Sequence, residues 1–423
     1  MESKIFTPFK LGPVILRNRT IRSAAFEGMC PGNSPSQELF DYHTAVARGG
    51  IGMTTVAYAA VCRSGLSFER QLWMRPEIVP ELKKLTDAIH AEGAKASIQL
   101  GHCGNMSHRR TCGRMPLGAS SGFNLYSPTF VHGMNLAEIE EVVKAYGTAV
   151  SLAIEAGFDC VEIHAGHGYL ISQFLSPYTN HRHDLYGGSL ENRMRFMREC
   201  MTEVIKAATN EDGTRKIAVI AKINTRDGFK GGMEVCDCIT VAKEMQKLGI
   251  DALVLSGGFV SKAPMYVMRG EFPVRVFAHY MPWKTQWWLK IGVMLGGKIV
   301  SPTVPFKPLF FMEDSLRFRA ALPDLPLIYV GGVNSRATAE KVMDSGFELF
   351  QMGRAVLEDT DFVKKMAADD KHCSGCEHIN FCIGRMYTIS MQCHKHCKDI
   401  TPGLQRSVEH IKRRNSRREA KLQ

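Results

Sequence analysis

Eight short runs of β-prone residues recur along the chain, and most are followed by an amphipathic stretch with helical periodicity. Over about 335 residues, eight predicted strands alternate with helices, and a closed parallel barrel has this number of strands. The alternative, an open doubly wound sheet, would carry a G-x-G-x-x-G fingerprint after its first strand, and residues 20–30 contain none. The sequence therefore predicts a (β/α)₈ TIM barrel. The predicted strands are Thr20–Phe26, Ile51–Ala57, Ala94–Leu100, Cys160–His164, Ile217–Ile223, Ala252–Ser256, Leu327–Val330 and Leu349–Met352.

Two regions depart from this alternation. A long insertion at about 259–322 separates the sixth and seventh strands, and connections of this length are usually functional. Within it, Lys284–Leu295 predicts a helix that either packs on the flank of the barrel or forms an apolar lid over the site. We predict a barrel over residues 1–365, a Cys-rich segment over 366–400 and a basic tail over 401–423. The insertion is aromatic, with Tyr280, Trp283, Trp287, Trp288, Phe306, Phe310 and Phe311.

The composition limits where in the cell the protein can be expected and which classes of partner it can bind. No apolar run approaches the roughly 20 residues of a membrane helix, and the first residues lack the pattern of a signal peptide. Thirteen cysteines without a secretory signal indicate a reduced compartment and metal ligation rather than disulfides. The net charge of +11 owes much to Arg406–Lys421, which predicts a solvated helix or a contact with an anionic or membrane surface. We expect a cytoplasmic protein without a membrane span or a nucleic-acid partner, and homo-oligomers are possible.

The residues after the fourth strand carry the most specific chemistry. Strand Cys160–His164 runs into the sequence H-A-G-H-G-Y, which places His164, His167 and Tyr169 at the carboxyl end of the strand. Active sites of barrels lie at this end. Two imidazoles can hold an electron-withdrawing oxygen, and a phenol can donate a proton. A glycine-rich connection with structural histidines is the alternative, but the three residues together favour a catalytic site.

The last two strands both end in glycine, which predicts a phosphate site. Gly331 and Gly332 follow the seventh strand, and Gly353 follows the eighth and precedes Arg354. Phosphate binding in barrels recurs after strands seven and eight, where backbone N–H groups face one anion. Glycine lets the backbone approach closely, and arginine supplies a bidentate cation. Simple turns are the alternative.

Two polar residues at other strand ends suit a flavin. Gln99 ends the third strand and Lys222 the fifth. A lysine near the end of a barrel strand is costly to bury unless it meets an anion or an electron-rich ring. An amide and a fixed cation match the carbonyls and the reduced ring of a flavin. Taken alone, Gln99 could be ordinary core polarity and Lys222 a structural ion pair.

Together these residues resemble the old yellow enzyme family of FMN-dependent NADH:flavin oxidoreductases. The most specific matching motifs are residues 18–26, 161–177, 180–182 and 186–193. The resemblance implies that His164 and His167 bind the carbonyl oxygen of the substrate and that Tyr169 donates a proton. It also implies cofactor contacts to the flavin at Ala24, Ala25, Phe26, Ala57, Gln99 and Lys222, and to the phosphate at Gly331, Gly332, Gly353 and Arg354.

The Cys-rich segment resembles one subgroup of this family, which includes 2,4-dienoyl-CoA reductase. That subgroup carries a [4Fe–4S] cluster at spacing C-x₂-C-x₃-C-x₁₁-C. Here Cys373, Cys376, Cys382 and Cys393 have the spacing C-x₂-C-x₅-C-x₁₀-C. The resemblance implies a [4Fe–4S] cluster on these four cysteines, while zinc and a reduced, metal-free hairpin stay open. We expect no separate nucleotide domain, because the chain ends about 26 residues after Cys397.

The predicted function is the NAD(P)H-dependent reduction of an activated C=C bond, in an enone or dienoyl-type substrate, by an FMN enzyme. NAD(P)H and substrate would use the same pocket in turn, and the aromatic insertion favours an apolar or bulky substrate. Two other classes stay open. A non-redox barrel enzyme would keep the phosphate site but would not need Lys222 beside Gln99. A flavin and iron–sulfur electron carrier would leave the His and Tyr residues unexplained.

Overall fold

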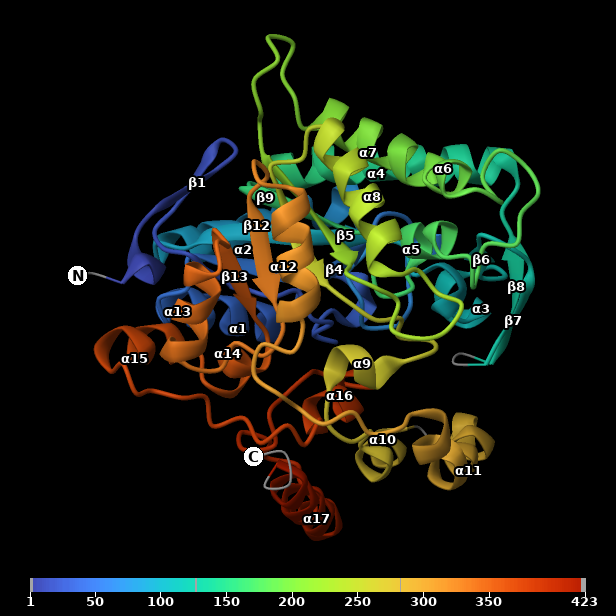
Figure 1. Ribbon diagram of the computed structural model, residues 1–423. Helices are drawn as coiled ribbons and strands as arrows, with labels where there is room; N and C mark the ends of the chain where they lie inside the picture. Colours follow the sequence, from blue (N-terminus) through green and yellow to red (C-terminus); the bar gives the residue numbers. More distant parts are fainter. Residues whose placement is uncertain (1–2, 126–127, 282, 420–423) are drawn as a thin grey trace.

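Eight parallel strands close into a barrel in the computed structural model, which describes residues 3–125, 128–281 and 283–419 (Figure 1). Each strand pairs with the next one along the chain, and the last pairs with the first. The predicted (β/α)₈ fold is therefore confirmed. The barrel strands are β3 (Thr20–Arg22), β4 (Met53–Ala60), β5 (Lys95–Gly101), β9 (Cys160–His164), β10 (Ala218–Asn224), β11 (Ala252–Ser256), β12 (Leu327–Val330) and β13 (Leu349–Met352).

The first strand is shorter than the sequence predicted. We expected Thr20–Phe26, but pairing ends at Arg22, opposite Met352 of β13. The Ser23 N–H still donates to the Met352 carbonyl at 2.8 Å, and the chain then leaves the sheet to run along a cavity. The residues after Arg22 are β-prone but have no strand partner, so their propensity alone misplaced the end of the strand.

Helices surround the barrel and start where the sequence marks them. Helix α4 (Leu136–Glu155) begins after the cap Asn135, whose side chain accepts from the Glu138 N–H while the Glu138 carboxylate accepts from the Asn135 N–H. A turn at Met194 separates the two helices over residues 190–207. The other surrounding helices are α1 (Gln37–Arg48), α2 (Val79–Ala91), α6 (Leu190–Arg193), α7 (Arg195–Ala207), α8 (Val235–Lys247), α12 (Met312–Ala321), α13 (Arg336–Asp344), α14 (Arg354–Glu358) and α15 (Phe362–Ala368).

An N-terminal hairpin closes the amino end of the barrel. Strands β1 (Phe9–Leu11) and β2 (Val14–Leu16) pair antiparallel. Their side chains Leu11, Val14 and Leu16 pack against apolar residues inside the barrel, and the whole cluster is buried. The amino end is therefore filled with apolar side chains, and the carboxyl end is left for a polar site.

Elements from the insertion and from the C-terminal segment gather on one side of the barrel (Figure 1). Buried apolar residues of α10, α16 and α17 form one cluster, so the predicted solvated tail is an amphipathic helix with one buried face. The elements on this side are α9 (Pro264–Met268), α10 (Val274–Tyr280), α11 (Trp283–Val300), α16 (Phe381–Met386) and α17 (Pro402–Glu419).

The remaining elements are short. They are α3 (Arg109–Cys112), α5 (Leu170–Leu175), β6 (Leu117–Gly118), β7 (Gly122–Asn124), β8 (Thr129–Gly133) and five 3₁₀ turns, Lys4–Phe6, Pro31–Asn33, Arg63–Gly65, Pro76–Ile78 and Gly104–Met106.

Two further features concern the chain as a whole. Among the residues that the structure describes, no helix combines the length and the apolar character needed to cross a bilayer. All thirteen cysteines are free thiols. The division of the chain into barrel, Cys-rich segment and basic tail stays a prediction.

Candidate active site

A cavity at the carboxyl ends of the barrel strands collects most of the predicted site residues. Strand ends form one part of its wall, and the insertion and the Cys-rich segment form another. Residues far apart in the sequence therefore meet around one space, as the barrel model requires. The predicted residues that line the cavity are Ala24, Ala25, Phe26, Gln99, His164, His167, Tyr169, Gly331, Gly332, Gly353, Arg354, Cys376 and Cys382.

The three predicted catalytic side chains lie together at the end of β9. The His164 ring lies 4.4 Å from the Tyr169 ring and 5.0 Å from the His167 ring, measured between centroids. His167 has a φ of 59°, and its N–H donates to the Asn224 side-chain oxygen at 2.8 Å. The Ser256 hydroxyl lies 2.7 Å from His167 Nε2 and so fixes the direction of the ring. Residues of β10 and β11 thus hold His167 in place.

The glycine between His167 and Tyr169 is required by close packing. Gly168 has a φ of 81°, which L-residues rarely adopt. A Cβ at this position would stand 2.5 Å from the Phe259 ring. The glycine therefore lets the chain turn tightly from strand to helix, and Tyr169 then begins α5 with its ring toward His164.

Burial sets the protonation states of this group. Burial lowers the pKa of His164 well below its usual value, and the nearby His167 and Lys222 lower it further. Burial, with a smaller effect of Lys222, lowers the pKa of His167 to about 3. Burial and the neighbouring Tyr387 raise the pKa of Tyr169 above its usual value. At neutral pH both imidazoles are therefore uncharged and can donate one N–H, and the phenol keeps its proton.

A buried carboxylate, which sequence reasoning missed, organises the polar floor of the site. Glu162 on β9 is fully buried, and its oxygens accept from Gln99 Nε2 at 2.6 Å and from Gln351 Nε2 at 2.5 Å. Lys222 Nζ lies 2.8 Å from the same carboxylate. Gln351, at the end of β13, also lines the cavity. A glutamate between Val161 and Ile163 in a buried strand was the signal that could have revealed this network.

The structure places Lys222 on the polar floor of the site, and its contact with the flavin ring stays a prediction. We expected it at the flavin ring, but it pairs with Glu162 and is not among the residues that line the cavity. Its Nζ also lies 3.4 Å from the Ser23 hydroxyl, which does line the cavity. The Lys222 side chain is long enough for its Nζ to pair with Glu162 and also to lie near Ser23 at the edge of the cavity.

A second buried ion pair supports the wall formed by residues 23–26. Arg22 Nη1 lies 2.6 Å from the Glu27 carboxylate, and both side chains are almost fully buried. Glu27 also accepts from the Ala57 N–H at 3.2 Å. Ala57 was predicted to touch the flavin, but its N–H is committed to Glu27 and it does not line the cavity. The pair instead ties the segment after β3 to β4.

The ends of β12 and β13 form an open cradle. Gly331 and Gly332 have φ values of 134° and 81°, and a Cβ at Gly332 would stand 2.8 Å from the Leu309 nitrogen. At Gly353 no atom lies within 4 Å of where a Cβ would be. Arg354 Nη1 donates to the Asn380 side-chain oxygen at 3.2 Å. Open space, glycine backbone and a guanidinium fit the phosphate of FMN.

The insertion contributes to the wall of the cavity but not through its longest helix. Val260, Met268, Phe306 and Phe310 line the cavity. Trp287 on α11 is 54% exposed, and α11 contributes none of the described lining residues. The described side chains of this helix therefore form no lid over the cavity; several of its side chains, including those of Trp283 and Trp288, lie outside the described part.

The four predicted metal ligands do not gather into one site. Cys376 and Cys382 line the cavity, and burial together with the neighbouring thiols raises the pKa of Cys382 to about 12 and that of Cys393 to about 11. Cys373 is exposed, and its thiol lies 3.4 Å from the Lys371 carbonyl. Across residues 3–125, 128–281 and 283–419, no three His, Cys, Asp or Glu side chains are arranged to hold a metal ion. The residues present therefore do not fit a preformed [4Fe–4S] cluster.

Comparison with known proteins gives the family. The family model described as NADH:flavin oxidoreductase / NADH oxidase matches residues 4–304. The chain is 39% identical over 385 residues to 4,4'-dithiodibutanoate disulfide reductase from Rhodococcus erythropolis, covering 91% of this chain and 93% of the relative. It is 35% identical over 278 residues to an NADPH dehydrogenase of Halalkalibacterium halodurans, covering 64% and 78%. The chain belongs to the NADH:flavin oxidoreductase / NADH oxidase family, as the old yellow enzyme resemblance predicted.

Solved structures agree with the fold. The old yellow enzyme homologue from Zymomonas mobilis superposes with a TM-score of 0.69 at 21% identity, covering 94% of this chain and 99% of that one. A 2-naphthoyl-CoA reductase superposes with a TM-score of 0.77 at 23% identity, covering 96% of this chain but only 58% of that one. The protein is an FMN-dependent NAD(P)H oxidoreductase, and membership of this family sets aside the non-redox alternative.

Proposed function

We propose that this protein reduces a C=C bond conjugated with a carbonyl group, with NAD(P)H as the reductant. The observation that carries the proposal is the meeting of two neutral imidazoles and one protonated phenol at the wall of the cavity that holds the phosphate cradle. FMN, when bound, supplies the hydride chemistry between NAD(P)H and the substrate. His164, His167 and Tyr169 supply the polar half of the reaction.

The imidazoles act on the carbonyl oxygen. Negative charge grows on that oxygen when hydride reaches the β-carbon, and two N–H donors stabilise it as an oxyanion hole does. His164 and His167 are suited to this role because burial keeps both neutral and their rings lie 5.0 Å apart. Ser256 and Asn224 keep His167 from turning away from the oxygen.

The phenol acts on the α-carbon. Tyr169 retains its proton at neutral pH and lies beside His164, which binds the adjacent oxygen. A general acid in this position donates its proton to the carbon next to the carbonyl. The Tyr58 ring packs 5.0 Å from the Tyr169 ring and limits its movement.

The wall of the cavity favours apolar substrates. Val260, Met268 and Phe310 of the insertion and Ile383 and Tyr387 of the C-terminal segment face the same space as the catalytic group. Such a wall fits a bulky enone or dienoyl compound better than a small polar one. NAD(P)H would use the same space before the substrate enters, in a ping-pong order.

An organic disulfide is a second candidate substrate. The relative that aligns with 91% of this chain is a 4,4'-dithiodibutanoate disulfide reductase. The cavity here is rich in sulfur, which makes favourable contacts with polarisable groups. In this reaction the S–S bond breaks, NAD(P)H provides two electrons, and two thiols form after uptake of protons. The lining sulfur residues are Met106, Met268, Met352, Cys376, Cys382, Met386 and Met391.

The [4Fe–4S] cluster has weaker support, and we assign it no step. Cys376 is close enough to Cys382 and Cys393 to raise the pKa of both, but the Cys373 thiol is exposed and lies against the Lys371 carbonyl. A cytoplasmic location remains part of the proposal, and the thirteen free thiols support a reducing compartment.

Stopped-flow measurement of both half-reactions tests the proposal. FMN in the anaerobic protein should be bleached by NADH or NADPH and then reoxidised by 2-cyclohexenone. Reoxidation by 4,4'-dithiodibutanoate but not by the enone would replace the C=C assignment with disulfide reduction. Tyr169→Phe also distinguishes the two substrate classes. The α-carbon of the enolate formed from an enone needs the phenol proton, whereas thiolates take protons from water. No bleaching by either nucleotide would contradict both candidates.

A further inference from the structure

Helix α11 presents an unpartnered apolar strip. Trp287, Ile291, Met294 and Leu295 are 54%, 43%, 57% and 79% exposed. Their spacing puts them on one face of the helix. The helix contains no acidic residue. Exposed apolar residues grouped in this way indicate a binding surface rather than ordinary scatter.

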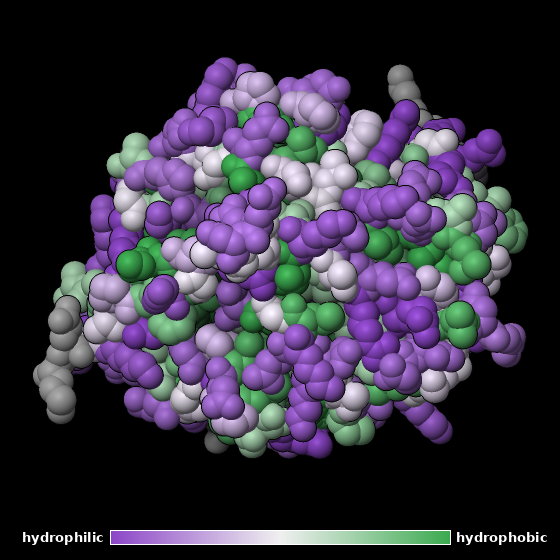
Figure 2. All heavy atoms as spheres, turned by 90° about the horizontal axis from the view of Figure 1, so that it is seen from above, coloured by the Kyte–Doolittle hydropathy of each residue, from purple (hydrophilic) through white to green (hydrophobic). Residues whose placement is uncertain are grey.

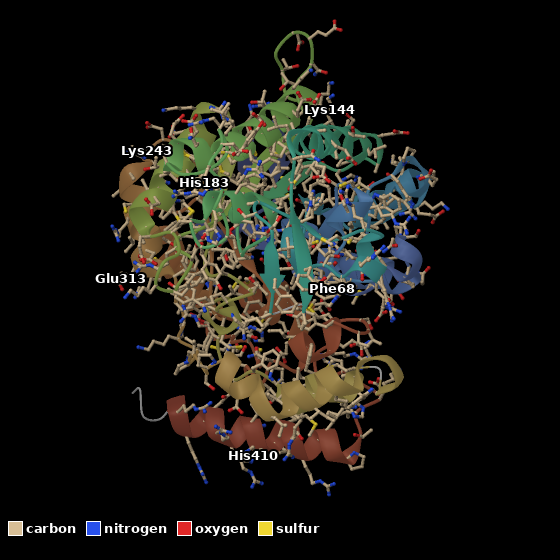
Figure 3. The ribbon with its side chains drawn as sticks, turned by 90° about the vertical axis from the view of Figure 1, so that its right-hand side faces the viewer. Phe68, Lys144, His183, Lys243, Glu313 and His410 are labelled. Atoms are coloured by element: carbon tan, nitrogen blue, oxygen red, sulfur yellow. The ribbon has the colours of Figure 1, made fainter. Side chains whose placement is uncertain are left out.

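A basic helix lies on the same side of the molecule. Helices α11 and α17 both pack against α10, beyond the carboxyl ends of the barrel strands (Figures 1 and 3). Arg406, Arg413 and Arg417 of α17 are exposed and form no ion pair within the described ranges. Helices α11 and α17 together contain nine Lys or Arg and two Glu, so they supply most of the net charge of +11.

A second apolar patch lies toward the same side. Phe123, Leu125 and Phe130, of the β7–β8 hairpin, are 52%, 83% and 69% exposed. Figures 1 and 3 both place this hairpin on the side of the barrel where α11 lies. Figure 2 looks at the opposite end of the molecule, where hydrophilic side chains cover most of the surface. The apolar strip of α11, the basic helix α17 and the hairpin patch therefore lie toward the same side of the molecule.

We propose that this end of the protein docks on the surface of an anionic lipid bilayer. The apolar strip of α11 enters the boundary between headgroups and acyl chains, where Trp is favoured, and the arginines of α17 contact anionic headgroups. The helix lies on the membrane and does not cross it, which agrees with the lack of a spanning helix in the described chain. The cytoplasmic leaflet carries the required negative charge.

Charge distinguishes a bilayer from the other possible occupants. A second copy covering the strip through a two-fold axis would bring two α17 helices of the same sign together. A nucleic acid would match the basic charge but would leave Trp287, Ile291, Met294 and Leu295 uncovered. Only an anionic bilayer meets both the apolar and the basic features. If the proposed function holds, docking would also bring the mouth of the cavity close to apolar substrates dissolved in the membrane.

Co-sedimentation of the FMN-bound protein with vesicles tests the proposal without relying on turnover. We expect binding to phosphatidylcholine vesicles that contain phosphatidylserine, little binding to phosphatidylcholine alone, and release at high salt. Arg413→Glu with Arg417→Glu should weaken binding at least about tenfold. The matched control, Lys206→Glu with Lys243→Glu, changes the same charge on the exposed faces of α7 and α8. These helices lie at the other end of the molecule (Figure 1), so the control should bind like the wild type.

The apolar strip needs its own variant. Leu295→Ser should weaken vesicle binding, whereas Leu185→Ser, which removes a leucine of similar exposure from a distant loop, should not. FMN content and bleaching by NAD(P)H should be unchanged in all these variants and so show intact folding. Absence of binding to anionic vesicles, or equal binding by Leu295→Ser, would overturn the proposal. A dimer in sedimentation analysis that Leu295→Ser dissociates would overturn it in favour of a second copy.

Discussion

Lys222 Nζ lies 2.8 Å from the Glu162 carboxylate, and both side chains are buried beneath the cavity. The same carboxylate accepts from the amides of Gln99 and Gln351. One buried negative charge therefore directs three side chains from three other strands, and it orients the free edge of Gln99 toward the cofactor space.

Removing either partner of this pair should destabilise the protein. Lys222→Met leaves Glu162 charged and without its cation, which should lower the free energy of unfolding by about 3–5 kcal/mol. Glu162→Gln leaves the ammonium uncompensated in the same way. The double variant should recover much of the loss, because no buried charge then remains. Urea unfolding of FMN-free protein measures all three, and additive losses in the double variant would contradict the coupling.

Arg354 should govern retention of FMN. A charge-assisted pair to phosphate contributes about 1.5–3 kcal/mol, so Arg354→Ala should raise the dissociation constant of FMN roughly 10- to 150-fold. Asn380→Ala is the control, because it removes the described hydrogen bond of Arg354 but keeps the charge, and a smaller loss is expected. Fluorescence titration of apoprotein with FMN gives both constants. An unchanged constant in Arg354→Ala would remove the phosphate assignment.

The barrel could be predicted from the sequence because each of its strands can be recognised from a few consecutive residues. Each strand reveals itself by a short buried run, and the eight runs matched the observed strands apart from their ends. His164, His167 and Tyr169 could be grouped because a tight glycine turn joins them. Gly332 and Arg354 could be grouped because neighbouring strands of a parallel barrel end at the same edge.

The remaining parts of the site depend on contacts between distant residues. The role of Glu162 arises only when β5, β10 and β13 bring Gln99, Lys222 and Gln351 to it. Sequence reasoning left an ion pair open for Lys222 but had no means of naming the partner. Spacing likewise grouped Cys373 with the other cysteines, while its orientation is set by the chain around Lys371.

Tyr169→Phe should separate the two half-reactions. Reduction of FMN by nicotinamide needs no proton from this phenol, so its rate should stay close to that of the wild type. Reoxidation by an enone should slow by about 10²–10⁴, the usual contribution of a general acid. Stopped-flow absorbance at the flavin band measures both rates. Equal slowing of both would mean that Tyr169 only shapes the pocket. Because burial raises its pKa, the wild-type step should also show no titration of this group near neutral pH.

Acid should destabilise the fold through buried neutral histidines. Burial lowers the pKa of His102 to about 3, compared with about 6.5 in an unfolded chain. Between these values the unfolded state binds a proton that the folded state does not, so the free energy of unfolding falls as the pH decreases, by about 1.4 kcal/mol per pH unit. His102→Gln should make the free energy of unfolding, measured with urea, less dependent on pH in this range, by the amount that corresponds to one bound proton.

Metal analysis of two cysteine variants tests the C-terminal segment. Cys376 lies close enough to Cys382 and Cys393 to raise the pKa of both, whereas Cys373 is exposed, so any metal bound here should depend on the first three thiols. If the anaerobically prepared protein carries iron or zinc in this segment, Cys376→Ser should remove the metal while FMN stays bound, and Cys373→Ser should leave the metal content unchanged. About four iron and four sulfide per chain would establish the [4Fe–4S] cluster, and one zinc without sulfide would replace it. Equal loss of metal in both variants would show that Cys373 is a ligand and that the segment rearranges when metal binds.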